Sequence, residues 1–232
     1  MILTVSALVG WLAGWLLARL SDYLPRFAVS GPPAHTPRAW ARPTLWQVLA
    51  SRLDTARLRQ ENRWFWLELG AELASAVIFA WAWAAFGLSL EAALVTGGYS
   101  FFLLIALTDI KYRLVLNALT YPAMALLVVG HLLFNQRNFP NVLVGGVFAF
   151  SIFYLVARLR PGDVGSGDIK LAALIGFCFG FPAMLLALIL GAGAGAGAAV
   201  WLLVRQQPDA KTYIPYAPFL CLGAFVALLV TV

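Results

Sequence analysis

The chain has 232 residues, of which 62% are hydrophobic and 11% are charged. A soluble domain carries about 25% charged residues, so the composition excludes an ordinary soluble fold and indicates a membrane protein with several spans. The formal net charge of +6 fits lysines and arginines at an inner membrane face better than a nucleic-acid partner, which we do not expect.

Eight apolar segments approach the length at which a helix crosses the hydrocarbon core of a bilayer. In chain order they are 2–20, 66–87, 91–108, 114–133, 140–158, 169–181, 183–204 and 214–231. The sixth is short, and we place its border with the seventh at Phe181-Pro182. The sequence therefore predicts an all-α, polytopic fold of about eight transmembrane helices.

The basic residues test this layout, because lysine and arginine accumulate in the cytoplasmic loops of membrane proteins. If the N-terminus lies outside, the inside segments are 19–65, 109–113, 158–170 and 205–213. These segments hold every lysine and arginine except Arg137. We therefore expect the N-terminus outside and a first span that is retained as an anchor.

The long segment between the first two spans, 22–65, is expected to be a cytoplasmic loop domain. Its first half is rich in proline and reads as a loop, whereas an amphipathic helix is predicted from Thr44 onward. That helix would lie on the membrane surface or dock against the other helices. The domains are thus a first transmembrane helix (1–21), this basic loop (22–65) and a membrane domain of about seven helices (66–232).

A run of glycine and alanine, GAGAGAGAAV at 191–200, falls inside a predicted span. Gly191 and Gly195 recur at four-residue spacing, and so do Gly193 and Gly197. Such faces let helix backbones approach closely, so we expect helix packing here and no phosphate-binding loop.

Two stretches, LIALTDIKYR at 104–113 and GSGDIKLAAL at 165–174, share one charged tripeptide. Each places an aspartate and a lysine against an apolar run: Asp109 with Lys111, and Asp168 with Lys170. Either aspartate alone could be an interfacial charge or a helix-capping charge. Both fall on the same predicted face, however, and the second follows two glycines that let the backbone approach another chain closely.

Paired carboxylates can hydrolyse a peptide bond without a metal or a nucleophilic side chain. One ionised carboxylate removes a proton from water while the other, protonated, polarises the carbonyl. Two such groups at close quarters tend to share one proton and titrate as a unit, so neither role is assigned to a named aspartate. A proton-coupled transporter could also use both aspartates, but it gives no reason for the GSGD sequence.

Other chemistry has less support. The cysteines, Cys178 and Cys221, lie in predicted spans without a CxxC pair, and the two histidines fall on opposite sides of the membrane. No metal-ligand spacing is present, so we expect no metal site.

Four stretches resemble the prepilin peptidase (type IV leader peptidase) family of GxGD membrane aspartyl proteases. GSGDIKL at 165–171 matches the GxGDxKL signature, and Asp109 is followed by Asn117, Thr120 and Pro122 as in that family's first aspartate motif. IPYAPFL at 214–220, which contains Pro215 and Pro218, and ELASA at 72–76 are similar to two further family segments.

The resemblance implies that Asp109 and Asp168 are the catalytic pair, within a compact helical bundle whose site lies near the cytoplasmic face. It implies prepilin or pseudopilin substrates, with a basic leader removed at the bacterial inner membrane. The supporting motif residues are Gly165, Gly167, Lys170, Lys111, Asn117, Pro215 and Pro218. The two lysines are expected to extend to the interface rather than to join the chemistry.

The resemblance implies that the basic leader needs acidic partners, and the candidates are Glu61, Glu68, Glu72 and Asp163, each of which could instead be an ordinary interfacial charge. Many family members also methylate the new N-terminus with S-adenosylmethionine, which is a cofactor here only if that activity is retained. Proteolysis itself needs no cofactor.

The chain departs from the family pattern at three places. Residues 22–65 contain no cysteine, so the paired CxxC motifs that many family members carry in this loop are missing. We therefore expect no zinc. Ala18 and Leu116 stand where asparagine and proline are usual. Another GxGD intramembrane protease and an inactive family member remain alternatives, while the oligomeric state is not predicted.

Overall fold

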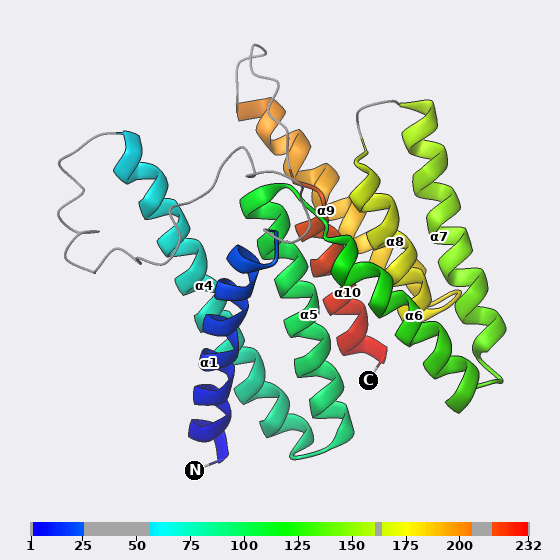
Figure 1. Ribbon diagram of the computed structural model, residues 1–232, viewed down its shortest axis with the longest axis horizontal. Helices are drawn as coiled ribbons and strands as arrows, with labels where there is room; N and C mark the ends of the chain where they lie inside the picture. The colour runs from blue at the N-terminus through cyan, green and yellow to red at the C-terminus, as the bar shows by residue number, and fades with distance from the viewer. Residues whose placement is uncertain (1, 26–55, 161–163, 206–214, 232) are drawn as a thin grey trace. The chain divides into compact units, whose positions relative to one another are not determined.

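The protein is described by a computed structural model that covers residues 2–25, 56–160, 164–205 and 215–231. Regular structure in these residues is helical, and the helices are α1 (Ile2–Tyr23), α4 (Ala56–Phe86), α5 (Leu90–Tyr112), α6 (Asn117–Phe134), α7 (Phe139–Leu159), α8 (Ser166–Phe179), α9 (Met184–Arg205) and α10 (Ala217–Thr231) (Figure 1). Each predicted apolar segment corresponds to one of them. The predicted all-α fold class is therefore confirmed.

Most of these helices can cross a bilayer. Within the described residues, 6 helices are long and apolar enough to do so: Leu3–Tyr23, Trp64–Phe86, Leu90–Tyr112, Asn117–Phe134, Phe139–Leu159 and Met184–Trp201. The helices α8 and α10 are shorter, with 14 and 15 residues. The chain is a multi-pass membrane protein.

The border between α8 and α9 lies where it was predicted. The helix α8 ends at Phe179, Gly180 follows with a positive φ of 68°, and α9 begins at Met184. Glycine adopts this left-handed conformation readily, which explains why the short helix stops there.

The helix α4 begins at Ala56 rather than at the predicted residue 66. Residues 56–63 are mostly good helix formers, so the helix continues beyond the apolar segment that marks the span. The amphipathic helix predicted from Thr44 falls largely in residues 26–55, which lie outside the described residues.

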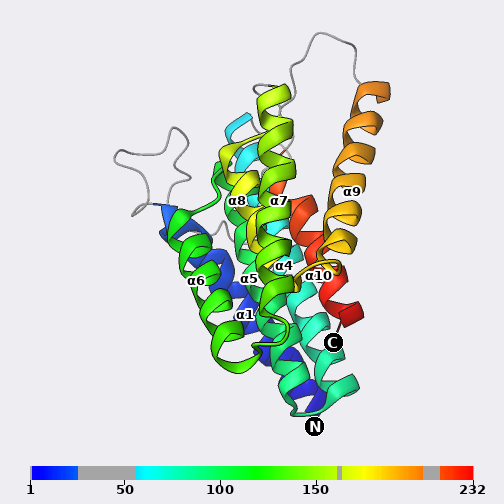
Figure 2. The same cartoon turned by 90° about the vertical axis from the view of Figure 1, so that its right-hand side faces the viewer.

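The chain forms two compact units, residues 1–100 and 101–232. In the first unit α1 and α4 lie side by side (Figures 1 and 2). Glycines on α1 permit this contact, because a Cβ on Gly10 would lie 2.6 Å from the Cβ of Phe79, and one on Gly14 would lie 2.8 Å from the Cα of Glu72.

In the second unit α8 packs against α6, α7, α9 and α10. Its buried face, Leu171 to Gly176, contributes to a core that also includes Ile105 of α5 and Leu220 of α10. The backbones of α7 and α8 approach closely at Gly145 and Gly176 (Figure 2). The short helix α8 is thus held on several sides, which fixes the residues at its N-terminus.

The helices α9 and α10 also pack closely. A Cβ on Gly191 would lie 2.8 Å from the Cα of Leu220, and one on Gly195 would lie 2.7 Å from the Tyr216 ring. Among the described residues, no atom would come within 4 Å of a Cβ on Gly193 or Gly197. Close packing is therefore confirmed for the first of the two predicted glycine faces, whereas no described residue packs against the second.

Candidate active site

Asp109 lies in the last turn of α5 and is 7% exposed. The backbone N–H of Ala217, the first residue of α10, donates to its carboxylate. The other oxygen, Oδ2, is buried and has no hydrogen-bond partner among the described residues. A buried polar atom without a partner is unfavourable, and such atoms often mark a position that a substrate or a proton occupies.

Asp168 lies in the first turn of α8 and is partly exposed. The backbone N–H of Gly165 donates to its Oδ2 at 3.3 Å, which closes the N-terminus of the helix. Burial raises the pKa of Asp168 above its ordinary value, and the Gly165 N–H opposes that rise by stabilising the ionised form. The side chain is therefore held in place by its own loop.

Each glycine of the GSGD sequence avoids a different steric contact. A Cβ on Gly165 would lie 3.2 Å from Oδ2 of Asp168, so glycine leaves room for the carboxylate. A Cβ on Gly167 would lie 2.9 Å from the Cβ of Val115, so glycine lets α8 approach the connection between α5 and α6. Together they allow the start of α8 to lie close to the end of α5.

Both aspartates line one cavity of about 310 Å³. Its lining residues are Asp109, Arg113, Leu114, Val115, Asn117, Gly165, Ser166, Gly167, Asp168 and Lys170. The charge of Asp168 acts on Asp109 across this cavity. The structure thus brings together the two predicted carboxylates, which come from different helices and distant parts of the sequence.

The lysines of the two motifs lie in different surroundings. Lys170 lines the cavity, donates from Nζ to Oδ1 of Asn117 at 2.8 Å, and lies over the Tyr121 ring at 5.4 Å from its centroid. Lys111 is 7% exposed and does not line the cavity. Lys170, expected only to extend to the interface, therefore belongs to the site.

The predicted IPYAPFL motif also reaches the site. Pro218 is the second residue of α10, a position that tolerates proline because the first-turn N–H groups have no partner within the helix. Tyr216, which precedes Ala217, lies within reach of the Asp168 charge. Pro215 precedes these residues in the described chain, whereas Ile214 lies outside it.

Sequence reasoning missed three contributors to this site. Arg113 lines the cavity with a positive φ of 54°, Tyr121 packs against the lysine, and Ala217 provides a backbone N–H. Only Ala217 carried a signal, since it lies within the IPYAPFL motif. No local pattern marked Arg113, because glycine is the usual residue in a left-handed position after a helix.

The acidic residues expected to bind a leader are not among the residues that line the cavity. Glu72 is 2% exposed, and its Oε2 accepts a hydrogen bond of 3.1 Å from Nε1 of Trp11. Glu68 is partly exposed on the same helix. Asp163 and the side chain of Glu61 fall outside the described residues. Leader binding by these groups stays a prediction, and the burial of Glu72 gives it little surface for a basic peptide.

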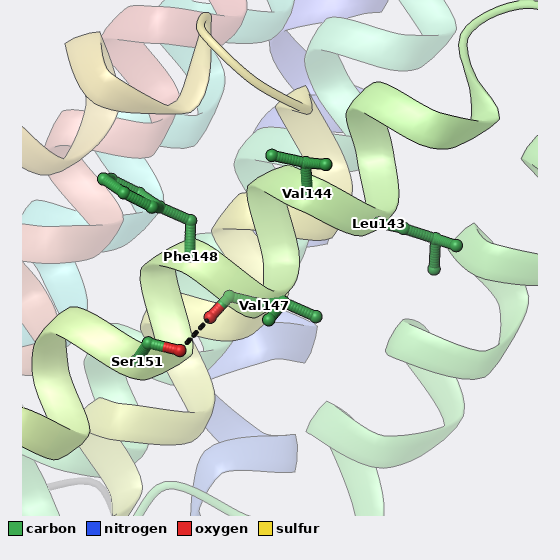
Figure 3. A pocket seen from close by; sticks show the side chains of 5 residues that line it. All are labelled: Leu143, Val144, Val147, Phe148 and Ser151. Carbon is green, nitrogen blue, oxygen red and sulfur yellow. Dashed lines mark hydrogen bonds between the residues drawn. The ribbon is translucent and has the colours of Figure 1, made fainter.

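A second cavity of about 380 Å³ lies along α7 and is lined by Leu143, Val144, Val147, Phe148 and Ser151 (Figure 3). Its one hydroxyl, on Ser151, donates to the backbone oxygen of Val147 at 2.7 Å (Figure 3). No ionisable group lines this cavity. It therefore offers an apolar surface and no acid–base chemistry.

No group of three or more His, Cys, Asp or Glu side chains that could hold a metal ion occurs in the part of the chain that the structure describes. The thiols of Cys178 and Cys221 are both free, and Cys221 is buried.

Comparison with known proteins identifies the family. The model of the type IV leader peptidase family matches residues 96–232, which is more than half of the chain and includes both aspartates. The chain belongs to the type IV leader peptidase family. The family resemblance predicted from the motifs is therefore confirmed.

Three relatives of this family carry the name prepilin leader peptidase/N-methyltransferase. The protein of Bacillus subtilis (strain 168) is 32% identical over 164 residues, which cover 68% of this chain and 64% of the relative. The protein of Pseudomonas putida is 27% identical over 202 residues, covering 84% and 69%. The protein of Pseudomonas aeruginosa is 28% identical over 205 residues, covering 84% and 68%.

The chain thus spans only about two thirds of the length of these relatives. No solved structure matches it significantly.

Proposed function

We propose that the protein is a membrane-embedded aspartyl endopeptidase that removes the basic leader from type IV prepilins or pseudopilins. The observation that carries the proposal is the shared cavity, which brings Asp109 and Asp168 together at the ends of two helices. Membership of the type IV leader peptidase family and the names of the relatives supply the substrate class.

The reaction is a hydrolysis that two carboxyl groups can perform with water alone. The ionised carboxylate takes a proton from water as the water oxygen bonds to the scissile carbonyl carbon, and the protonated carboxyl gives its proton to the carbonyl oxygen. The tetrahedral intermediate then breaks at the C–N bond as the leaving amine takes a proton back. The buried and unpartnered Oδ2 of Asp109 is a suitable position for the shared proton or for a substrate oxygen.

The localisation follows from the charge pattern and the family. We infer a multi-pass protein of the bacterial inner membrane, with its N-terminus outside and its active site facing the cytoplasm. In this orientation every basic residue but Arg137 lies in a cytoplasmic segment, and so do both aspartates. An uncleaved leader would meet the site from the same compartment.

N-methylation of the new N-terminus is a second activity that the names of the relatives suggest. The family resemblance implies that the cytoplasmic loop, 22–65, helps to form the methyl-donor site, and residues 26–55 of that loop lie outside the described residues. We therefore derive no step through this cofactor. The mass of the cleaved product, measured with and without S-adenosylmethionine, decides whether a methyl group is added.

The test of the peptidase is cleavage of a model prepilin by the purified full chain in detergent. Asp109→Asn and Asp168→Asn each remove the titratable proton at nearly constant shape. General acid–base groups contribute about 10²–10⁴-fold, so each variant should lose at least about a hundredfold in kcat. Circular dichroism should show both variants folded. Near-full activity in either variant, or failure of the wild type to cut any prepilin, would overturn the proposal.

A further inference from the structure

The strongest unexplained feature of the cavity is the restraint on Lys170. Its ammonium group donates to Oδ1 of Asn117 at 2.8 Å and lies over the Tyr121 ring, with 5.4 Å to the centroid. Both partners belong to α6, whereas the lysine belongs to α8, two residues after Asp168. A long, flexible side chain loses rotamer freedom when it is held in this way, so the restraint needs a compensating benefit.

The chemistry of the two partners suggests what that benefit is. An amide oxygen and an aromatic ring are both neutral, so they hold the ammonium without cancelling its positive charge. The held charge lines the same cavity as Asp109 and Asp168. A cation near two carboxylates favours their ionised forms, most strongly where burial keeps water away.

We propose that Asn117 and Lys170 form a positioning pair that holds one positive charge in the cavity that Asp109 and Asp168 line. The fixed charge keeps one carboxylate ionised at neutral pH, as the hydrolysis requires, although the cavity is partly shielded from water. This inference deepens the proposed peptidase function and rests on it. Neither residue of the pair touches the reacting atoms in this account; both act through the aspartates.

Other charged or titratable groups also face the carboxylates. Arg113 acts on Asp109 from the connection between α5 and α6. Tyr216, before α10, interacts with Asp168, and Cys221 of α10 interacts with both aspartates. Arg113 is the other cation that lines the cavity, so loss of Lys170 should weaken the bias toward the ionised form and not abolish it.

The experiment measures kcat for a model prepilin as a function of pH, using the purified full chain and four variants. Lys170→Met removes the charge, and its acid limb should move to higher pH by about one unit. Lys170→Arg keeps a charge and should restore most of the wild-type profile. Arg158→Met removes an exposed charge that does not line the cavity and serves as the matched control, with a wild-type profile.

The fourth variant, Asn117→Asp, separates positioning from simple packing. Asn117 is the first residue of α6, where a negative charge is favourable to the helix, so this variant should fold. An aspartate would still hold Lys170, but it would cancel the lysine charge. If the pair acts through charge, the acid limb should rise as it does in Lys170→Met, even though the contact is kept.

The outcomes are distinct. If the wild type cuts no prepilin, the proposed function itself fails. If the wild type cuts, and both Lys170→Met and Asn117→Asp keep the acid limb of Arg158→Met, the positioning pair is wrong. If Lys170→Met loses its fold by circular dichroism, Lys170→Gln, which keeps a polar head group without the charge, takes its place: a raised acid limb supports the inference, and an unchanged one overturns it.

Discussion

The tripeptide Asp-Ile-Lys occurs at 109–111 and again at 168–170, and the fold gives its two copies opposite surroundings. The first copy lies in the last turn of α5, and the second lies in the first turn of α8. A helix favours negative charge at its N-terminus and disfavours it at its C-terminus. The N-terminus of α8 thus suits Asp168, whereas Asp109 relies on a donor from a third helix, the N–H of Ala217 in α10.

The lysines of the two copies, Lys111 and Lys170, also lie in different surroundings. Lys170 lines the cavity and is held by Asn117, whereas Lys111 is 7% exposed and lies outside the cavity lining. The same local sequence therefore supplies an accessible carboxylate with a fixed cation in one copy, and a buried carboxylate in the other. The two carboxylates of the dyad therefore differ in burial and in charged neighbours before any substrate binds.

The largest difference between the two copies is expected when each aspartate is lengthened by one methylene group. Asp109→Glu lengthens a buried side chain whose carboxylate is fixed by a backbone N–H, so the carboxyl group leaves its productive position and kcat should fall about ten- to hundredfold. Asp168→Glu projects from a partly exposed position into the cavity and should lose clearly less. Prepilin cleavage rates of the two variants, at matched melting temperatures, make the measurement.

An equal loss in both glutamate variants would contradict the asymmetry. It would show that both carboxyl groups must keep their positions equally well, although one is buried and the other is partly exposed.

The approach of the second copy to the first depends on Gly167. In Gly167→Ala the new Cβ would lie 2.9 Å from the Cβ of Val115, so the start of α8 must move away from the end of α5. Overpacking of this kind costs about 1–3 kcal/mol, and we expect about a tenfold loss of activity. The added change Val115→Gly removes the Cβ that the new methyl group meets and should recover most of the loss in the same cleavage assay. A double variant as weak as Gly167→Ala would show that the contact is not the reason for this glycine.

The sequence predicts the helices of this molecule better than the contacts between them. Apolar length alone locates each helix that the structure describes, and the GSGD and IPYAPFL motifs point to the elements around the cavity. The start of α4 was misplaced because polar residues from Ala56 onward extend the helix without an apolar signal.

The partners within the site could not be predicted in the same way. The contact between Asn117 and Lys170, and the N–H that Ala217 gives to Asp109, depend on how distant helices pack. Apolar patterning shows which residues avoid water, but it does not show which helix ends meet. The two aspartates were predicted from the residues alone, because charge in a membrane protein is rare, whereas Asn117 and Lys170 were predicted only as motif residues.

A smaller effect should separate the two backbone donors. Gly165 has φ −72° and ψ 150°, values that proline can adopt, so Gly165→Pro removes the N–H that donates to Asp168 with little change of backbone. Gly165→Ala adds the same Cβ but keeps the N–H and is the matched control. The pKa of Asp168, which burial already raises, should rise further when the N–H is lost, because that N–H stabilises the ionised form.

A higher pKa of Asp168 means that its ionisation needs a higher pH. The acid limb of kcat should therefore move to higher pH in Gly165→Pro relative to Gly165→Ala, by about half a pH unit or more. Coincident acid limbs would show that the Gly165 N–H does not control the ionisation that limits the reaction.

The smallest effect is expected from Lys111→Met, which tests the lysine half of the comparison. Lys111 stands two residues after Asp109, as Lys170 does after Asp168, yet it does not line the cavity. Because Lys111 does not line the cavity, kcat should stay within about twofold of the wild type and the acid limb should not move. The assay is the pH profile of prepilin cleavage, run beside Lys170→Met.

A shift in Lys111→Met as large as that in Lys170→Met would mean that the dyad responds to the net charge of this face of the protein. The position of one held ammonium would then be irrelevant, and the two copies of the tripeptide would be equivalent in charge although they differ in burial.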